Sequence, residues 1–261
     1  MNSASASLPP VQMLWVEGPL STLERLSIAS FLANDHAVHL YTYGDVPNVP
    51  NGAQIINANE VLPDGPQRRV LQRGIGAGSW AFFSNLFRYR LLYDRGGLWC
   101  DTDIVCLRPL TFTLERPRFF ATERTPQASG QGSLPIRVAS CAMQALARDP
   151  LLLECFERAA GVDGDAVPWG SAGPELLTRL INERQLAAEL LAPDVFCPID
   201  HWNFISLIQG VQLVAGEAYA VHFWNELWRR NFCDKNARYD PLSLYERLKA
   251  GYLGRREAAH A

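Results

Sequence analysis

The sequence predicts an α/β protein, and three stretches of it carry that prediction. Residues 11–57 show a strand, a helix and two further strands in that order, which is how nucleotide-binding α/β domains commonly begin. Residues 80–95 form a helix that is apolar over most of its circumference, which is typical of a buried helix. Residues 98–105 then read as a β-rich strand that carries two aspartates. Open α/β sheets bind their ligands at the ends of such strands, so we expect a polar site there.

The elements of the first part follow from local signals. Residues 11–16 predict the first strand. Ser21 and Glu24 have the spacing of a capping box and predict a helix that begins there. Residues 38–43 and 54–57 predict the second and third strands.

A narrow polar stripe interrupts the apolar surface of the helix over 80–95. Ser84 and Arg88 are four residues apart, and Asn85 and Arg88 are three apart, so all three side chains project from one side. Gly96 and Gly97 predict the end of this helix, because a positive φ costs glycine little.

Asp101 and Asp103 are predicted to aim at one point. In an extended chain, residues two apart face the same way. Two carboxylates beside a buried helix are costly unless something positive neutralises them. A hard cation such as Mg²⁺ or Mn²⁺ suits such oxygen ligands. A lone D-x-D also occurs by chance or as a strand end, but its place after a hydrophobic strand favours the metal interpretation.

These motifs together carry a family resemblance. Ser84-Asn85-x-x-Arg88, Leu91-Leu92-Tyr93, Gly96-Gly97 and Asp101-Thr102-Asp103 resemble the DXD region of retaining glycosyltransferases that use nucleotide sugars. That group holds initiating mannosyltransferases, α-1,4-galactosyltransferases and, more distantly, the clostridial glucosylating toxins. The resemblance implies a GT-A fold, which is a Rossmann-like, mostly parallel sheet flanked by helices, with an α-rich acceptor-side subdomain. Many members have Asp where this chain has Asn85, whose amide can hydrogen-bond but brings no charge.

The resemblance also implies an organisation and a set of site residues. A single domain is expected over 11–261, with a nucleotide-sugar-binding half over 11–110 and an acceptor-side half over 111–261 that ends in a closing segment. Catalytic roles are expected for Asp101, Asp103 and Arg88. Metal ligands are expected at Asp101, Asp103 and His222. The residues expected at the nucleotide sugar are Trp15, Ser84, Asn85, Arg88, Asp101, Gly173, Pro174, Trp224, Asn225 and Trp228.

Several of these positions keep a structural alternative. Trp15 could stack on the base or pack in the core. Gly173 and Pro174 resemble a T-G-P segment that lies against the donor sugar, but the same residues suit an ordinary helix start. His222 could complete the metal shell, since imidazole suits Mn²⁺ better than Mg²⁺, or be structural. The basic segment 63–79 could close over a diphosphate or be a solvated loop.

The second half of the sequence gives fewer signals of structure and function. Residues 118–123 predict a strand, 138–148 and 150–160 predict helices, and 236–253 predict an amphipathic helix. A polar and aromatic cluster has no assignable role; it consists of Asp200, His201 and Trp202.

Composition limits the function classes. The net charge of −3 gives no indication of the basic surface that nucleic-acid binding requires. The six cysteines show no C-x-x-C pair, so buried free thiols are favoured over a disulfide frame or a zinc site. Residues 1–10 lack the basic and apolar regions of a signal peptide and predict a disordered leader. No run approaches the roughly 20 apolar residues of a membrane span. A cytoplasmic, bacterial enzyme is therefore expected, since Golgi relatives usually carry an N-terminal anchor.

The function implied is transfer of a sugar from a nucleotide sugar to a hydroxyl acceptor with retention of configuration, assisted by Mn²⁺ or Mg²⁺. A UDP-sugar is favoured over a GDP-sugar. The acceptor would be a glycan, lipid-linked or protein hydroxyl, in bacterial polysaccharide or glycoconjugate synthesis. Two alternatives remain open: another metal-dependent enzyme of nucleotide sugars or NTPs, either a hydrolase or a nucleotidyltransferase, and a non-catalytic α/β nucleotide-binding protein.

Overall fold

The computed structural model describes residues 7–65, 77–126, 135–162 and 168–254. Within these residues the main sheet has the strand order β3-β2-β1-β4-β7-β6. Strands β3, β2, β1 and β4 are parallel, and β7 runs antiparallel to its two neighbours, β4 and β6. A small second sheet pairs β5 with β8. The strands are β1 Val11–Trp15, β2 Val38–Thr42, β3 Ala53–Asn57, β4 Gly97–Cys100, β5 Ile104–Cys106, β6 Phe119–Arg124, β7 Ile136–Ala145 and β8 Ala220–His222. The predicted α/β class with a mostly parallel sheet is confirmed.

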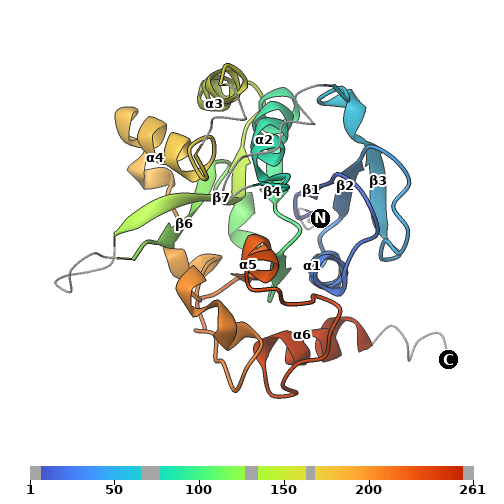
Figure 1. The fold of residues 1–261 in the computed structure, drawn as a ribbon. Coiled ribbons are helices and arrows are strands. Elements are labelled where there is room, and N and C mark those ends of the chain that lie inside the picture. The colour runs from blue at the N-terminus through green and yellow to red at the C-terminus, as the bar shows by residue number, and fades with distance from the viewer. Residues whose placement is uncertain (1–6, 66–76, 127–134, 163–167, 255–261) are drawn as a thin grey trace, which may run out of the picture.

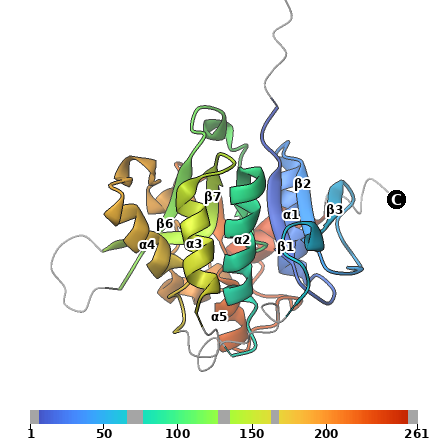
Figure 2. The same cartoon turned by 90° about the horizontal axis from the view of Figure 1, so that it is seen from above.

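Helices cover both faces of the main sheet (Figures 1 and 2). Helices α2, α3 and α4 pack on one face, and α1 and α6 pack on the other. Leu98 and Cys100 of β4 point into the core below α1, and Trp99 points into the core below α2, as the two-residue period of a strand requires. The α-helices are α1 Thr22–Ala33, α2 Ala81–Arg95, α3 Pro150–Ala160, α4 Pro174–Glu183, α5 Asn225–Arg230 and α6 Leu244–Tyr252, and 3₁₀ turns span Ala58–Glu60, Thr111–Leu114, Ala187–Glu189, Pro193–Val195 and His201–Leu207. None of the described helices is long and apolar enough to cross a membrane.

The helix signals in the sequence are confirmed at α1 and α2. The Ser21 amide donates to the Glu24 carboxylate at 2.8 Å, and the Ser21 side chain caps the first turn of α1. Helix α2 ends at Gly96, which has a φ of 65°. A Cβ atom at Gly96 would lie 2.5 Å from the backbone nitrogen of Ala147, so only glycine lets the chain pass this closely.

The prediction of a helix over 138–148 is wrong, because these residues form most of β7. Strand β7 lies between β4 and β6 and is covered by helices, so apolar side chains occupy both of its faces. A strand buried on both sides reads as a continuous apolar run, which periodicity alone does not distinguish from a buried helix. The helix predicted over 236–253 is shorter, because Ser243 caps α6 and delays its start.

Some predictions fall outside the described residues. They concern 1–6 of the proposed leader, 66–76 of the basic segment, and the tail after 254. Pro9, at the end of the proposed leader, lies in the described part, and its carbonyl oxygen is 3.1 Å from His36 Nδ1.

Candidate functional site

The two aspartates lie in a turn that carries the chain from the main sheet to the small one. The prediction that 98–105 form one continuous strand is wrong: β4 ends at Cys100 and β5 begins at Ile104. The Ile104 amide donates to the Asp101 carbonyl oxygen at 3.1 Å and closes the turn. Both carboxylates nevertheless line one cavity. The turn therefore brings the two side chains to one place, as the strand was expected to do.

Arg88 holds Asp101 in place. Its Nη2 lies 3.1 Å from Asp101 Oδ1, and the same oxygen accepts a hydrogen bond of 2.8 Å from Trp99 Nε1. The rest of the guanidinium donates to the Ser84 carbonyl at 3.1 Å, to the Ser84 hydroxyl at 2.7 Å and to the Ser140 carbonyl. Ser84 and the Ser140 carbonyl fix the guanidinium of Arg88, and Arg88 in turn pairs with Asp101. The predicted polar stripe therefore holds the first aspartate in position.

Asp103 meets His222 because β5 pairs with β8. Ile104 lies opposite His222 in that ladder, which brings His222 Nε2 to 3.2 Å from Asp103 Oδ2. The same oxygen accepts a 2.7 Å hydrogen bond from the Asn225 amide at the start of α5. The second oxygen, Asp103 Oδ1, is buried and has no hydrogen-bond partner among the described residues.

The two carboxyls have opposite electrostatic surroundings. Burial raises the pKa of Asp101, although the charge of Arg88 opposes this shift. Burial also acts to raise the pKa of Asp103, but His222, the Asn225 amide and Lys235 outweigh it and lower the pKa. Burial acts to lower the pKa of His222, but the Asp103 carboxylate outweighs it and raises the pKa well above its ordinary value. Asp103 is therefore ionised and lies beside the protonated ring of His222.

The unpartnered Asp103 oxygen tests whether this site fits a metal ion. A buried carboxylate oxygen without a donor carries a desolvation penalty that a hard cation would remove. Asp101 and Asp103 supply oxygen ligands and His222 supplies a nitrogen, and all three line the cavity. This donor set fits Mn²⁺ or Mg²⁺.

The cavity beside the aspartates has a volume of about 740 Å³, a size that suits a small-molecule ligand. Asn85 lines its wall, and Gly173 packs against the Asn85 side chain. A Cβ atom at Gly173 would lie 2.8 Å from Asn85 Nδ2, so the start of α4 rests directly on the polar stripe of α2. Asn85 Oδ1 is buried and has no hydrogen-bond partner among the described residues, and Pro174 lines the same wall. The structure thus brings together three residues that the resemblance placed at the sugar.

The three predicted tryptophans all line the cavity but differ in their burial. Trp15 is partly exposed at the end of β1, and its Nε1 donates to Gly18 O at 2.8 Å. The Trp224 ring lies against His222, with ring centroids 3.9 Å apart. Trp228 is only 1% exposed and packs among core aromatic rings, so most of its surface serves the core.

Sequence reasoning missed Lys235. Its Nζ lies 2.6 Å from the buried carboxylate of Glu24 and 2.8 Å from Asn225 Oδ1. It is also 5.9 Å from the Trp15 ring, and it lines the cavity. A single lysine in the polar segment after α5 carries no local signal, and only the fold brings it to the part of the cavity near Asn225.

A buried acid on the opposite wall was also missed. Glu123 of β6 is paired with Arg137 of β7, and both line the cavity together with His201. Of the polar cluster without an assigned role, His201 is therefore at the site, whereas Trp202 is 40% exposed outside the lining.

The structure combines an α/β sheet with an acidic turn whose two carboxylates line a cavity. A family model described as the glycosyltransferase sugar-binding region containing the DXD motif matches residues 76–120, which include α2, β4 and both aspartates. The predicted resemblance is thereby confirmed, because this segment matches the sugar-binding region of DXD-containing glycosyltransferases.

A curated human protein is similar over a longer stretch. Human α-1,4-N-acetylglucosaminyltransferase is 26% identical over 161 residues, which are 55% of this chain and 42% of the human protein. The chain therefore spans less than half the length of this relative.

Solved structures of glycosyltransferases are similar in outline. The PaToxG glycosyltransferase has a TM-score of 0.46 at 13% identity, covering 68% of this chain and 70% of its own. GlyE of Streptococcus pneumoniae TIGR4 has a TM-score of 0.44 at 11% identity, covering 95% and 64%. The bifunctional WbbM glycosyltransferase has a TM-score of 0.44 at 12% identity, covering 93% and 52%. TM-scores below 0.5 do not by themselves define a shared fold.

Proposed function

We propose that this protein is a metal-dependent, retaining glycosyltransferase that moves a hexosyl group from a UDP-sugar to a hydroxyl acceptor. The observation that carries the proposal is the unpartnered, buried oxygen of Asp103, which lies beside Asp101 and His222 at the cavity wall. It occurs within the segment that matches the DXD sugar-binding region.

The charged residues of the cavity would bind the metal ion and the diphosphate of the donor. Asp101, Asp103 and His222 would hold the metal ion, which would supply positive charge to the leaving diphosphate. Arg88 keeps Asp101 in position, and Lys235 adds a cation of the chain itself on the same side of the cavity.

Other residues would orient the donor. Trp15, partly exposed near Lys235, offers an aromatic face to the base. Asn85, with its free amide oxygen beside Gly173, offers an acceptor to a sugar hydroxyl. Retention of configuration is implied by the resemblance, and front-face attack assisted by the leaving phosphate needs no carboxylate nucleophile.

The sugar and the acceptor are proposed more broadly. The name of the human relative makes UDP-N-acetylglucosamine the first donor to test. The acceptor is a glycan, lipid-linked or protein hydroxyl, and a setting in bacterial polysaccharide synthesis follows from the resemblance alone.

The first experiment is calorimetric titration of UDP and of GDP, each with and without Mn²⁺. We expect Mn²⁺-dependent binding of UDP that is lost in the double variant Asp101→Ala/Asp103→Ala. The control is Asp45→Ala, which removes an exposed carboxylate outside the cavity and should bind UDP as the wild type does. Binding that is independent of Mn²⁺, or equal in the double variant, contradicts the metal-bridged donor site.

A second experiment separates the proposed reaction from its rivals. The protein is incubated with UDP-N-acetylglucosamine, with or without a hydroxyl-bearing acceptor, and UDP release and the anomeric configuration of the product are measured. Acceptor-dependent release with an α-configured product supports retaining transfer. Equal release without acceptor would indicate a nucleotide-sugar hydrolase.

A further inference from the structure

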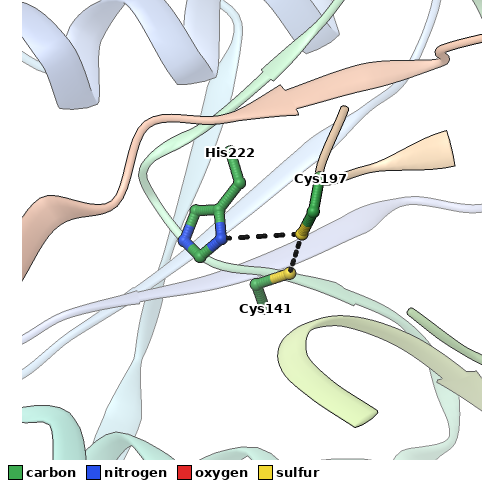
Figure 3. A group of neighbouring side chains, drawn as sticks. All are labelled: Cys141, Cys197 and His222. Carbon is green, nitrogen blue, oxygen red and sulfur yellow. Dashed lines mark hydrogen bonds between the residues drawn. The ribbon is translucent and has the colours of Figure 1, made fainter. Parts of the chain in front are cut away.

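Two cysteines and His222 lie close together (Figure 3). They are next to the aspartate turn, since the Asp101 amide donates to the Cys141 carbonyl and His222 Nε2 lies 3.2 Å from Asp103 Oδ2. Cys141 comes from β7, Cys197 from the segment after the 3₁₀ turn Pro193–Val195, and His222 from β8. Cys141 Sγ lies 3.9 Å from Cys197 Sγ, and Cys197 Sγ lies 3.8 Å from His222 Nδ1. All three ligand atoms lie within 4.8 Å of one another.

The two separations that involve Cys197 are close to those of a tetrahedral metal site. Metal–sulfur bonds of about 2.3 Å at the tetrahedral angle place two sulfurs about 3.8 Å apart. A metal–nitrogen bond of about 2.0 Å places the nitrogen about 3.5 Å from each sulfur. Shifts of a few tenths of an ångström would bring Cys197 Sγ to these distances from Cys141 Sγ and from His222 Nδ1.

The donor chemistry differs from that of the aspartate turn. Two thiols and an imidazole select thiophilic ions such as Zn²⁺, whereas carboxylate oxygens suit Mg²⁺ and Mn²⁺. Two further observations go beyond the packing of buried thiols. The Nε2 atom of His222 lies 3.2 Å from the Asp103 carboxylate, which reproduces the carboxylate–histidine–metal arrangement of metal centres. Cys141 and His222 also line the large cavity, which gives an ion a path to the site.

We propose that Cys141, Cys197 and His222 Nδ1 bind a thiophilic divalent cation such as Zn²⁺, next to and distinct from the carboxylate site. Binding forms two metal–sulfur bonds and one metal–nitrogen bond, and the two thiol protons and the Nδ1 proton of the His222 imidazolium leave to solvent. The fourth position of the tetrahedron takes a water molecule, as in zinc sites with three protein ligands.

A consequence follows that rests on the proposed function. With the ion on Nδ1, the proton of the neutral imidazole sits on Nε2 and is donated to Asp103. His222 is then lost as a ligand of the Mn²⁺ site, so the thiophilic cation weakens Mn²⁺-dependent binding of UDP.

The test measures metal binding to the reduced, metal-stripped protein by equilibrium dialysis with Zn²⁺ and by the absorption spectrum with Co²⁺. We expect a single Zn²⁺ per chain and the sulfur-to-cobalt charge-transfer bands of a tetrahedral site. The variants Cys141→Ser and Cys197→Ser should weaken Zn²⁺ binding by on the order of 100-fold, since even outer partners of a metal ligand contribute 10- to 100-fold. Cys155→Ser is the matched control, because this buried thiol lies in the core on the α3 face.

The outcomes distinguish this site from the donor site. Zn²⁺ binding that survives in Asp101→Ala, which removes a ligand of the proposed carboxylate site, supports a separate cation site. Zn²⁺ binding that is lost in Asp101→Ala but kept in Cys197→Ser overturns it. Absence of thiolate charge-transfer bands in the wild-type Co²⁺ spectrum also overturns it, and this readout requires no variant to fold.

Discussion

Replacing Arg88 by methionine tests whether the polar stripe of α2 exists to hold Asp101. The change keeps an unbranched stem but removes the guanidinium group, with its charge and its donors. In the wild type these donors reach Asp101, the Ser84 carbonyl and hydroxyl, and the Ser140 carbonyl. Afterwards the Asp101 carboxylate keeps only the hydrogen bond from Trp99.

The expected loss of stability in Arg88→Met depends on how deeply the Arg88 and Asp101 side chains are buried. Breaking a buried ion pair costs about 3–5 kcal/mol. The side chain of Arg88 is 4% exposed but that of Asp101 is 25% exposed, so water compensates part of the loss, and we expect Arg88→Met to lower the free energy of unfolding by about 3 kcal/mol. Because a carboxylate without its partner is the main cost, Asp101→Asn should recover about 1–2 kcal/mol in the double variant.

The assay is urea unfolding followed by tryptophan fluorescence, on the wild type, both single variants and the double variant. Arg90→Met is the matched control, because Arg90 lies on the same helix and pairs with Asp94 at the surface. That exposed pair is expected to contribute less than about 1 kcal/mol. If the effects of Arg88→Met and Asp101→Asn are additive within about 0.5 kcal/mol, the pair does not organise the site and the reasoning is refuted.

Three further perturbations probe the backbone, a buried titratable group and the cavity. Gly96→Ala should destabilise the fold by about 2 kcal/mol or more, from the left-handed φ and the close backbone of β7; Gly251→Ala, in α6 with open space around it, should be neutral or stabilising by up to about 1 kcal/mol, and equal effects in urea unfolding would contradict this. Burial lowers the pKa of His36, so the unfolded chain binds a proton that the folded chain refuses as pH falls below about 6.5. The His36 contribution to the free energy of unfolding should therefore decrease from pH 7.5 to pH 5.5. Relative to the wild type, His36→Gln should make the free energy of unfolding fall less, or rise more, over this range; an unchanged slope speaks against the prediction. Lys235→Met should weaken Mn²⁺-dependent binding of UDP about tenfold, the value of one charge-assisted hydrogen bond, whereas Lys249→Met, outside the cavity, should leave calorimetric binding unchanged.

The local signals of the sequence were sufficient for much of the fold. The capping box at Ser21 and the glycines that end α2 depend on hydrogen bonds and backbone angles within a few residues, so they can be recognised without the rest of the chain. The same holds for the Ser84 and Arg88 pair, which one turn of helix brings together. These features sufficed to place the DXD motif after a strand of an α/β sheet, although not to predict that it forms a turn.

Other features depended on pairing between distant segments. Strand β7 reads as a helix until β4 and β6 pair with its edges and helices cover both of its faces. The position of His222 beside Asp103 depends on the register of β8 against β5. The position of Lys235 depends on the buried carboxylate of Glu24, far away in the sequence.

The sequence by itself therefore determined the class of the fold, the helix that supports the site and the identity of the acidic motif. Only the tertiary structure decided that Asp101 is held by Arg88, that His222 meets Asp103, and that Cys141 and Cys197 converge behind it. The physical reason is that helix caps and turns are stabilised by neighbours in the chain. Strand register and the meeting of buried side chains are instead decided by how the whole core packs.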